Sequence, residues 1–179
     1  MKKSEEMEMV KYWKWFFRNG YKRFYDKWLL FHVLVSFLLA GVVPLSLYEA
    51  SKGLLLPTVG ILIGLSFAWS GNALALLSTD EIQEFTGYHD GGIAEYAYVL
   101  LSSILSLIVT LVGWGLAGLD IFDSVWPGDS CVLTYYFIKV FLYLILSVSI
   151  RECWSVVMGT QMLLLAKVEV ARRKKEKNS

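Results

Sequence analysis

The sequence predicts an all-α membrane protein with four transmembrane helices, preceded by an amphipathic interfacial helix and followed by a basic cytoplasmic helical tail. Composition is the first reason: 56% of the 179 residues are apolar and 18% are charged, whereas soluble domains have about 45–50% and about 25%. The second reason is that the apolar residues gather in uncharged runs long enough to cross a bilayer. With 2 Cys, the chain is not a disulfide-stapled scaffold.

Residues 1–27 form the first expected element, a basic and aromatic segment. At helical spacing its large rings lean to one side and its basic residues occupy the remainder. This pattern is typical of an amphipathic helix in the headgroup layer. The alternative is a nucleic-acid platform, in which cations contact phosphates and rings stack on bases. The rings available for stacking are Trp13, Trp15 and Phe16.

Residues 28–166 form the expected transmembrane domain. A bilayer core about 30 Å thick requires about 20 helical residues. We expect spans over 28–47, 56–79, 96–119 and 131–152, the last continuing toward 166. Pro44 interrupts the first run near its end, and Pro57 suits the first turn of the second helix.

Residues 167–179 form the basic tail, and charge sets the expected orientation. Residues 1–27 carry eight Lys and Arg against four acids, and residues 167–179 carry six against two, so each end has a net charge of +4. Short Lys- and Arg-rich flanks stay in the cytoplasm, and four spans allow both termini to be there. The first apolar run has full span length, so we expect no cleaved signal peptide.

The second span carries a row of small or polar residues at four-residue spacing. We name this row the α-helical stripe. It consists of Gly60, Gly64, Ala68 and Asn72. Small residues in this register let two helices approach closely in lipid, where packing drives association. The stripe therefore predicts tight helix packing, either within one chain or between copies.

The third span carries hydroxyl groups at the same spacing, on Ser102, Ser106 and Thr110. One interpretation is that these hydroxyls bond to carbonyls of their own helix. The other is that they line a water-filled path when several copies surround an axis.

The fourth span contains the residues that are most costly in a membrane: Lys139, Arg151 and Glu152. A charge near the bilayer centre costs roughly 2.5–3.5 kcal/mol on insertion scales, so it usually faces protein or water. If the span begins near Cys131, Lys139 extends outward, and Arg151 and Glu152 are interfacial. If the span is centred near residue 151, Arg151 becomes a pore or ligand residue.

Basic residues near both ends of the chain predict a polyanionic ligand on the cytoplasmic side, because symmetry would gather them around one axis. The candidates are Arg18, Lys22, Arg23, Arg151, Lys167, Arg172 and Arg173. The competing interpretation is that these cations contact only anionic lipid headgroups.

Enzymatic function is not expected. The sequence contains no P-loop, nucleophile elbow or HExxH motif. His32 and His89 lie on different segments, and one His with scattered carboxylates is weak support for a metal. We expect neither a metal nor another cofactor.

The overall plan resembles the four-span, ion-channel-like membrane effectors of the bacterial Hailong anti-phage defence system. The resemblance rests on the basic aromatic N-terminal segment, the four spans, the helix end at residues 66–78 and the basic tail. It implies a homotetramer in the bacterial inner (plasma) membrane. It further implies that DNA oligomers from a partner nucleotidyltransferase hold the effector closed, and that their loss depolarises the cell.

The function expected from these features is a homo-oligomeric channel or pore-forming effector, gated by a nucleotide or DNA oligomer. Four spans leave little room for a conduit inside one chain, so the path would lie on an oligomer axis. The alternative is a membrane scaffold that uses its stripe and basic termini to hold proteins and anionic lipids. A small transporter is a third class, disfavoured because the sequence shows no inverted repeat.

Overall fold

The computed structural model describes residues 2–18, 20–77, 92–126 and 132–177, and within these ranges the only regular structure is helical. Three segments are long and apolar enough to cross a membrane: Leu47–Leu77, Tyr96–Gly118 and Val132–Arg173. The prediction of an all-α, membrane-type chain is therefore confirmed.

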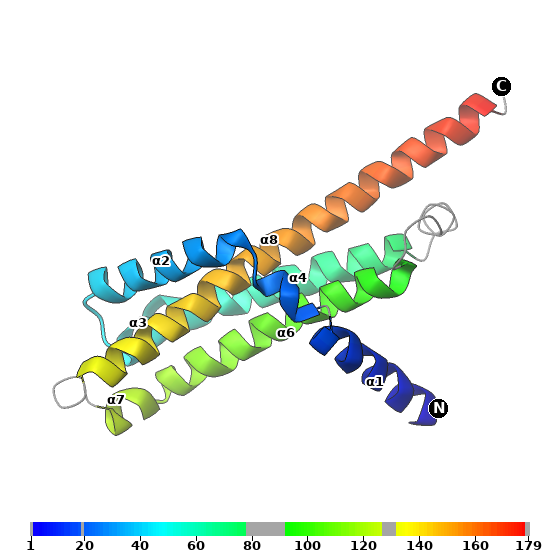
Figure 1. Cartoon of the computed structure of the whole chain (residues 1–179). Coiled ribbons are helices and arrows are strands. Elements are labelled where there is room, and N and C mark those ends of the chain that lie inside the picture. The colour runs from blue at the N-terminus through cyan, green and yellow to red at the C-terminus, as the bar shows by residue number, and fades with distance from the viewer. Residues whose placement is uncertain (1, 19, 78–91, 127–131, 178–179) are drawn as a thin grey trace.

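Three long helices run side by side and form the body of the molecule (Figure 1). They are α4 (Leu56–Leu77), α6 (Gly92–Gly118) and α8 (Val132–Lys177). A shorter helix, α2 (Lys27–Val42), covers α8 over only part of the bundle, and α1 (Lys2–Arg18) leaves the bundle at an angle. The connecting elements are a 3₁₀ turn η1 (Gly20–Phe24), α3 (Leu47–Ala50), a π turn η2 (Ser51–Leu55) and α7 (Ile121–Val125).

The core consists of two clusters along the bundle. The first joins α2, α3, α4, α6 and α8 around the buried side chains of Leu47, Trp114 and Tyr143. The second contains Leu77, Leu100 and other apolar residues of α4, α6 and α8 only. Because α2 contributes to one cluster alone, the bundle has four helices at one end and three at the other.

The first predicted span is shorter than expected. Helix α2 has 16 residues, which corresponds to about 24 Å at 1.5 Å per residue. It ends because Val43 is extended (φ −78°, ψ 110°), the conformation that a following proline favours. Ser46 and Glu49 then form a capping box that begins α3, so residues 43–47 are not part of the first helix.

The other predicted spans correspond to longer helices than expected. Helix α4 continues α3 and η2, giving an unbroken helical segment of 31 residues from Leu47 to Leu77. Helix α8 has 46 residues, about 70 Å, and unites the predicted fourth span with the predicted basic tail. Its C-terminal end projects beyond the other helices (Figure 1). The predicted C-terminal end of the second span, residues 78–79, lies outside the described residues.

Candidate functional site

A buried carboxylate marks the candidate site, where α8 packs against α6. Glu152 is 1% exposed, although it lies in a helix apolar enough to cross a membrane. Its Oε2 accepts a hydrogen bond from the Ser103 hydroxyl of α6 at 2.9 Å, and its Oε1 accepts one from Arg151 Nη2 at 3.2 Å. The partners of the carboxylate thus include a neutral donor and a cation.

The Arg151 guanidinium extends this pairing to the start of α2. Its Nη1 donates to Asp26 Oδ1 at 2.9 Å, and its side chain is 16% exposed. The same Asp26 oxygen accepts the backbone N–H groups of Trp28 and Leu29 at 3.0 and 3.2 Å, which caps α2. We name Asp26, Arg151, Glu152 and Ser103 the charged network. The structure therefore buries Glu152 and leaves Arg151 half-buried between its two acidic partners, rather than leaving both as exposed interfacial charges.

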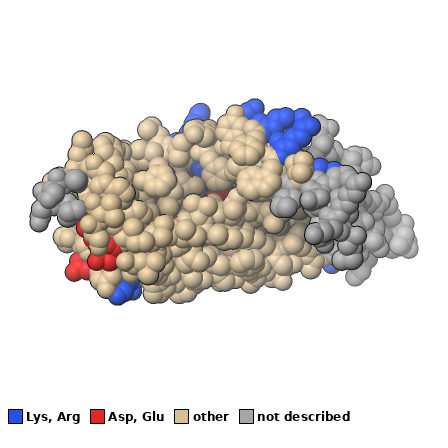
Figure 2. Space-filling view, turned by 90° about the horizontal axis from the view of Figure 1, so that it is seen from below, with Lys and Arg blue, Asp and Glu red and all other residues tan. Residues whose placement is uncertain are grey.

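A cavity of about 410 Å³ borders the charged network on the α2 side. Its lining includes Asp26, Arg151 and Glu152, together with His32 and Ser155. Figure 2 shows acidic and basic atoms at the bottom of a hollow in the otherwise uncharged middle of one face. Ionisable groups therefore adjoin open space at the depth of the apolar helices.

The predicted pore-lining hydroxyls lie between α6 and α8. Thr110 Oγ1 is 2.6 Å from Ser149 Oγ and donates to the Ser106 carbonyl at 2.9 Å. Ser106 donates to the Ser103 carbonyl at 2.8 Å, and Ser102 donates to the Val99 carbonyl at 2.8 Å. All three predicted hydroxyls thus bond to carbonyls of their own helix, as one of the two interpretations expected.

Two further polar side chains hold α2 against α8. His32 Nδ1 lies 2.7 Å from the Ser147 hydroxyl. At the other end of α2, Lys139 Nζ donates to the carbonyls of Val43 and Leu45 at 2.6 and 3.1 Å. Lys139 is buried and caps α2. It therefore does not extend outward, the orientation expected for a span that begins near Cys131.

The predicted ligand-binding cations are not gathered at one place. Arg151 belongs to the charged network, while Arg172 and Arg173 lie on the projecting end of α8, about 30 Å further along at 1.5 Å per residue. Both tail residues are exposed and pair with Glu176 and Glu169. Lys167 is half-buried. Arg18 and Lys22 are exposed at the N-terminal end, and the Arg23 side chain lies outside the described residues.

The predicted stacking rings differ in their surroundings. Trp13 is 41% exposed and stacks on Phe17, with ring centroids 5.8 Å apart. Trp15 packs against Tyr98 of α6, with centroids 5.5 Å apart. Tyr12 also contacts Tyr98, and burial raises the pKa of its hydroxyl. Trp15 and its neighbour Tyr12 therefore dock α1 on α6, and Trp13 is the ring left open to a ligand or to lipid.

The α-helical stripe lies on the outer face of α4. Gly60, Gly64, Ala68 and Asn72 are all exposed, and a Cβ added at either glycine would meet nothing within 4 Å. Close approaches inside the chain occur instead at two glycines of α6: an added Cβ would lie 3.1 Å from Leu142 and Ile145 at Gly113, and 3.0 Å from Leu56 and Ser51 at Gly118. Within the described part of the chain, the stripe does not pack against another helix, and its small residues stay open to a partner or to lipid.

No match was found when the chain was compared with family models, curated proteins and solved structures. The site is therefore interpreted from its own geometry. Among the described residues, no group of three or more His, Cys, Asp or Glu side chains is placed to hold a metal ion. His89, the other histidine considered, lies outside the described residues.

Sequence reasoning identified Arg151 and Glu152 but missed their partners. Asp26 and Ser103 lie 125 and 49 positions away from the side chains they contact. One signal for Asp26 was present, because an acidic residue directly before an apolar run is a typical helix N-cap. Nothing in the spacing distinguishes Ser103 from the neighbouring serines.

Proposed function

We propose that the chain is a homo-oligomeric channel or pore-forming effector of a bacterial inner membrane. The observation that supports this most is the charged network beside a cavity of about 410 Å³, set among helices apolar enough to cross a bilayer. Ionisable residues within membrane segments are costly and usually mark ion or substrate pathways.

In the proposed topology all four apolar helices cross the membrane and both termini are cytoplasmic. Helix α2 is about 24 Å long, so it requires modest local thinning of the bilayer, an adjustment known for short spans. The start of α2, together with the charged network that Asp26 joins, would lie toward the inner surface, and the basic ends of the chain favour the cytoplasmic side.

Assembly of several copies would supply the conduction path. One chain uses its polar residues to hold α2, α6 and α8 together, so a continuous path requires an axis shared by copies. The outward stripe of α4 offers small residues for contact between copies. The resemblance to Hailong effectors extends the proposal in three ways. The assembly would be a tetramer, a DNA oligomer would keep the pore closed, and a partner nucleotidyltransferase would make that oligomer.

Ion flux tests this proposal. The full chain, reconstituted in liposomes that hold a potassium gradient, should pass ions, and a short DNA oligomer should reduce the flux. Glu152→Gln should alter the flux, because it changes the charge beside the cavity. Glu169→Gln is the matched control, since this Glu of α8 also pairs with an Arg but is 51% exposed. Liposomes that stay sealed both with and without the oligomer would contradict the proposal.

The scaffold alternative is favoured by one observation, the stripe of small residues on the outer face of α4. Such a face also suits a different membrane partner. Overexpression in a bacterium distinguishes the two functions. A pore without its closing ligand should depolarise the cells, as a voltage-sensitive dye would report, whereas a scaffold should leave the membrane potential unchanged.

A further inference from the structure

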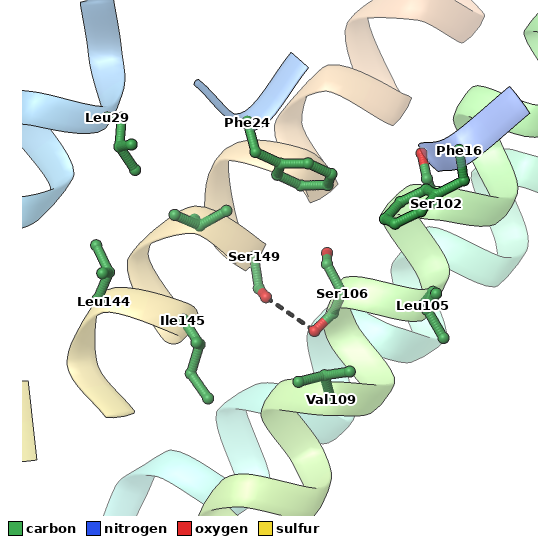
Figure 3. A pocket seen from close by; sticks show the side chains of 11 residues that line it. Phe16, Phe24, Leu29, Ser102, Leu105, Ser106, Val109, Leu144, Ile145 and Ser149 are labelled. Atoms are coloured by element: carbon green, nitrogen blue, oxygen red, sulfur yellow. Dashed lines mark hydrogen bonds between the residues drawn. The ribbon is translucent and has the colours of Figure 1, made fainter. Parts of the chain in front are cut away.

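A second cavity, of about 270 Å³, lies between the N-terminal segment, α6 and α8. Its walls are mainly apolar. Leu105 and Val109 come from α6, and Leu144 and Val148 from α8. Phe16 and Phe24 cover one end; Figure 3 shows the Phe24 ring reaching over the space between α8 and α6. The N-terminal segment thus completes a pocket whose other walls are membrane-type helices.

The three serines in the wall do not make the cavity a polar site. Ser102 donates to the Val99 carbonyl at 2.8 Å, and Ser106 to the Ser103 carbonyl at 2.8 Å. Ser149 donates to the Ser106 carbonyl at 3.2 Å, the bond drawn in Figure 3. Each hydroxyl proton is therefore used inside the protein, and the cavity suits an apolar ligand.

The surroundings of the cavity favour a lipid chain. Its walls belong to helices that are apolar enough to cross a membrane, so acyl chains are the apolar groups that surround it there. Small-molecule pockets usually enclose about 300–1,000 Å³, and a volume of about 270 Å³ therefore fits part of one acyl chain rather than a whole lipid.

Charge near the covered end favours an anionic headgroup. Phe16 and Phe24 line the cavity, and the short segment between them carries Arg18 and Lys22, both exposed to solvent. The nearby carboxylate of Asp26 is already bound by Arg151 and by two N–H groups of α2. Two exposed cations thus lie within six residues along the chain of the rings that cover the cavity, and the nearest acid along the described chain is engaged elsewhere.

We propose that this cavity binds one acyl chain of an anionic phospholipid, whose phosphate contacts Arg18 and Lys22. A lipid held there packs against Phe16 and Phe24 and so stabilises the N-terminal segment against α6 and α8. This site is separate from the cavity beside the charged network, and it does not depend on whether the chain conducts ions.

Photo-crosslinking tests the proposal on the full chain in lipid nanodiscs. The probes are phosphatidylglycerol and phosphatidylcholine that carry the same diazirine-labelled acyl chain, and peptide mapping locates the products. We expect phosphatidylglycerol to label the peptides of α6 and α8 that contain Leu105, Val109 and Leu144 more strongly than phosphatidylcholine does.

Two matched pairs of variants make the test specific. Val109→Trp should fill the cavity and remove most of this labelling, while Val112→Trp, also exposed on α6 but outside the cavity, should not. Arg18→Gln and Lys22→Gln should each lower the preference for phosphatidylglycerol about fivefold, the factor that corresponds to about 1 kcal/mol per cation beside anionic lipid. Lys52→Gln, at the α3 end of the bundle, is their control.

Three results would overturn the proposal: equal labelling by the two lipids, labelling that Val109→Trp leaves unchanged, or equal effects of Val112→Trp and Val109→Trp. The Arg18 and Lys22 variants change exposed residues, so they still test the headgroup contact if Val109→Trp does not fold. Because the readout is labelling, sealed liposomes in the flux experiment would reject the channel and leave this lipid site standing.

Discussion

A carboxylate in the middle of a membrane-type helix depends on each of its partners. Burying a charge away from water is costly unless the charge is paired and hydrogen-bonded. Here Glu152 is matched by Arg151 and Ser103, and Arg151 is matched by Asp26. Removing one member takes away one of the partners of the next, so the contributions of these side chains to stability are coupled.

The first prediction concerns Glu152→Gln. The amide keeps a polar atom facing Ser103 but removes the charge that pairs with Arg151, which still has Asp26. We expect the free energy of unfolding to fall by about 1–3 kcal/mol, the range for disrupting a buried hydrogen-bonded charge. Reversible unfolding in detergent, followed by circular dichroism, measures this loss.

Glu169→Gln is the control for this prediction. Its partner Arg173 lies four residues away, and both side chains are exposed, so the change should stay within about 0.5 kcal/mol. Equal losses of unfolding free energy for the two substitutions would show that burial does not increase the contribution of the charged network to stability.

At the residue scale, the sequence identifies costly side chains but not their partners. Arg151 and Glu152 stand out because they interrupt an apolar run. The contact of Arg151 with Asp26 depends on where α2 begins along α8, and that register is set by packing in three dimensions. The same reason explains Lys139, whose acceptors Val43 and Leu45 lie 96 and 94 positions earlier.

At the scale of the elements, α2 is held by side chains of α8 near both of its ends. Asp26 caps its N-terminus and binds Arg151, while Lys139 binds carbonyls just beyond its C-terminus. Carbonyls at a helix C-terminus carry partial negative charge and lack intrahelical partners. A buried ammonium group at this place therefore allows α2 to end inside the bundle.

The second prediction is that Lys139→Met loosens the end of α2. Methionine fills a similar volume but leaves the carbonyls of Val43 and Leu45 without these donors, at a cost of about 1–3 kcal/mol. Amide hydrogen exchange should become faster in the last turn of α2. Lys52→Met changes an exposed lysine and should leave exchange in α2 as it is, and the prediction is wrong if Lys139→Met does the same.

Element boundaries show which sequence signals were decisive. Hydropathy located three membrane-type helices, because uncharged runs are long there. It overextended the first helix, since it weighs residues 43–47 like those before them and ignores the local effects of Pro44 and of the Ser46–Glu49 capping box. Hydropathy also divided α8 into a span and a tail, at the point where the sequence changes from apolar to basic. The helix nevertheless continues through the basic residues to Lys177, because Lys, Arg and Glu have good helical propensity.

At the scale of the whole molecule, the proposed assembly of copies would use the outer face of α4. Gly64→Leu adds a bulky group where an added Cβ meets nothing within 4 Å, so the single chain should fold unchanged. If copies pack through the stripe, the Gly64→Leu variant should have a particle mass in detergent that drops toward that of the monomer.

Gly115→Leu is the control. Its added side chain lies in open space on α6, so this variant should keep the mass of the unchanged protein. An unchanged mass for Gly64→Leu would assign assembly to another face.

The distribution of cations over the molecule yields the last prediction, which concerns oligonucleotide binding. The side chains of Arg172 and Arg173 are each 72% exposed, and their pairs with Glu176 and Glu169 are surface pairs, which are weak enough for phosphates to displace. Arg151 is 16% exposed and holds Asp26 and Glu152. The tail of α8, rather than Arg151, is therefore expected to contact a polyanion.

The double variant Arg172→Gln, Arg173→Gln should weaken binding of a short labelled single-stranded DNA, as fluorescence anisotropy measures it. Two lost phosphate contacts should reduce the slope of log K against log salt by about 1.4, at ~0.7 per contact for single strands. Arg151→Gln should leave that slope unchanged. If Arg151→Gln reduces the slope as much as the double variant does, the ligand reaches the charged network directly, and phosphate binding and the cavity beside Glu152 form one site.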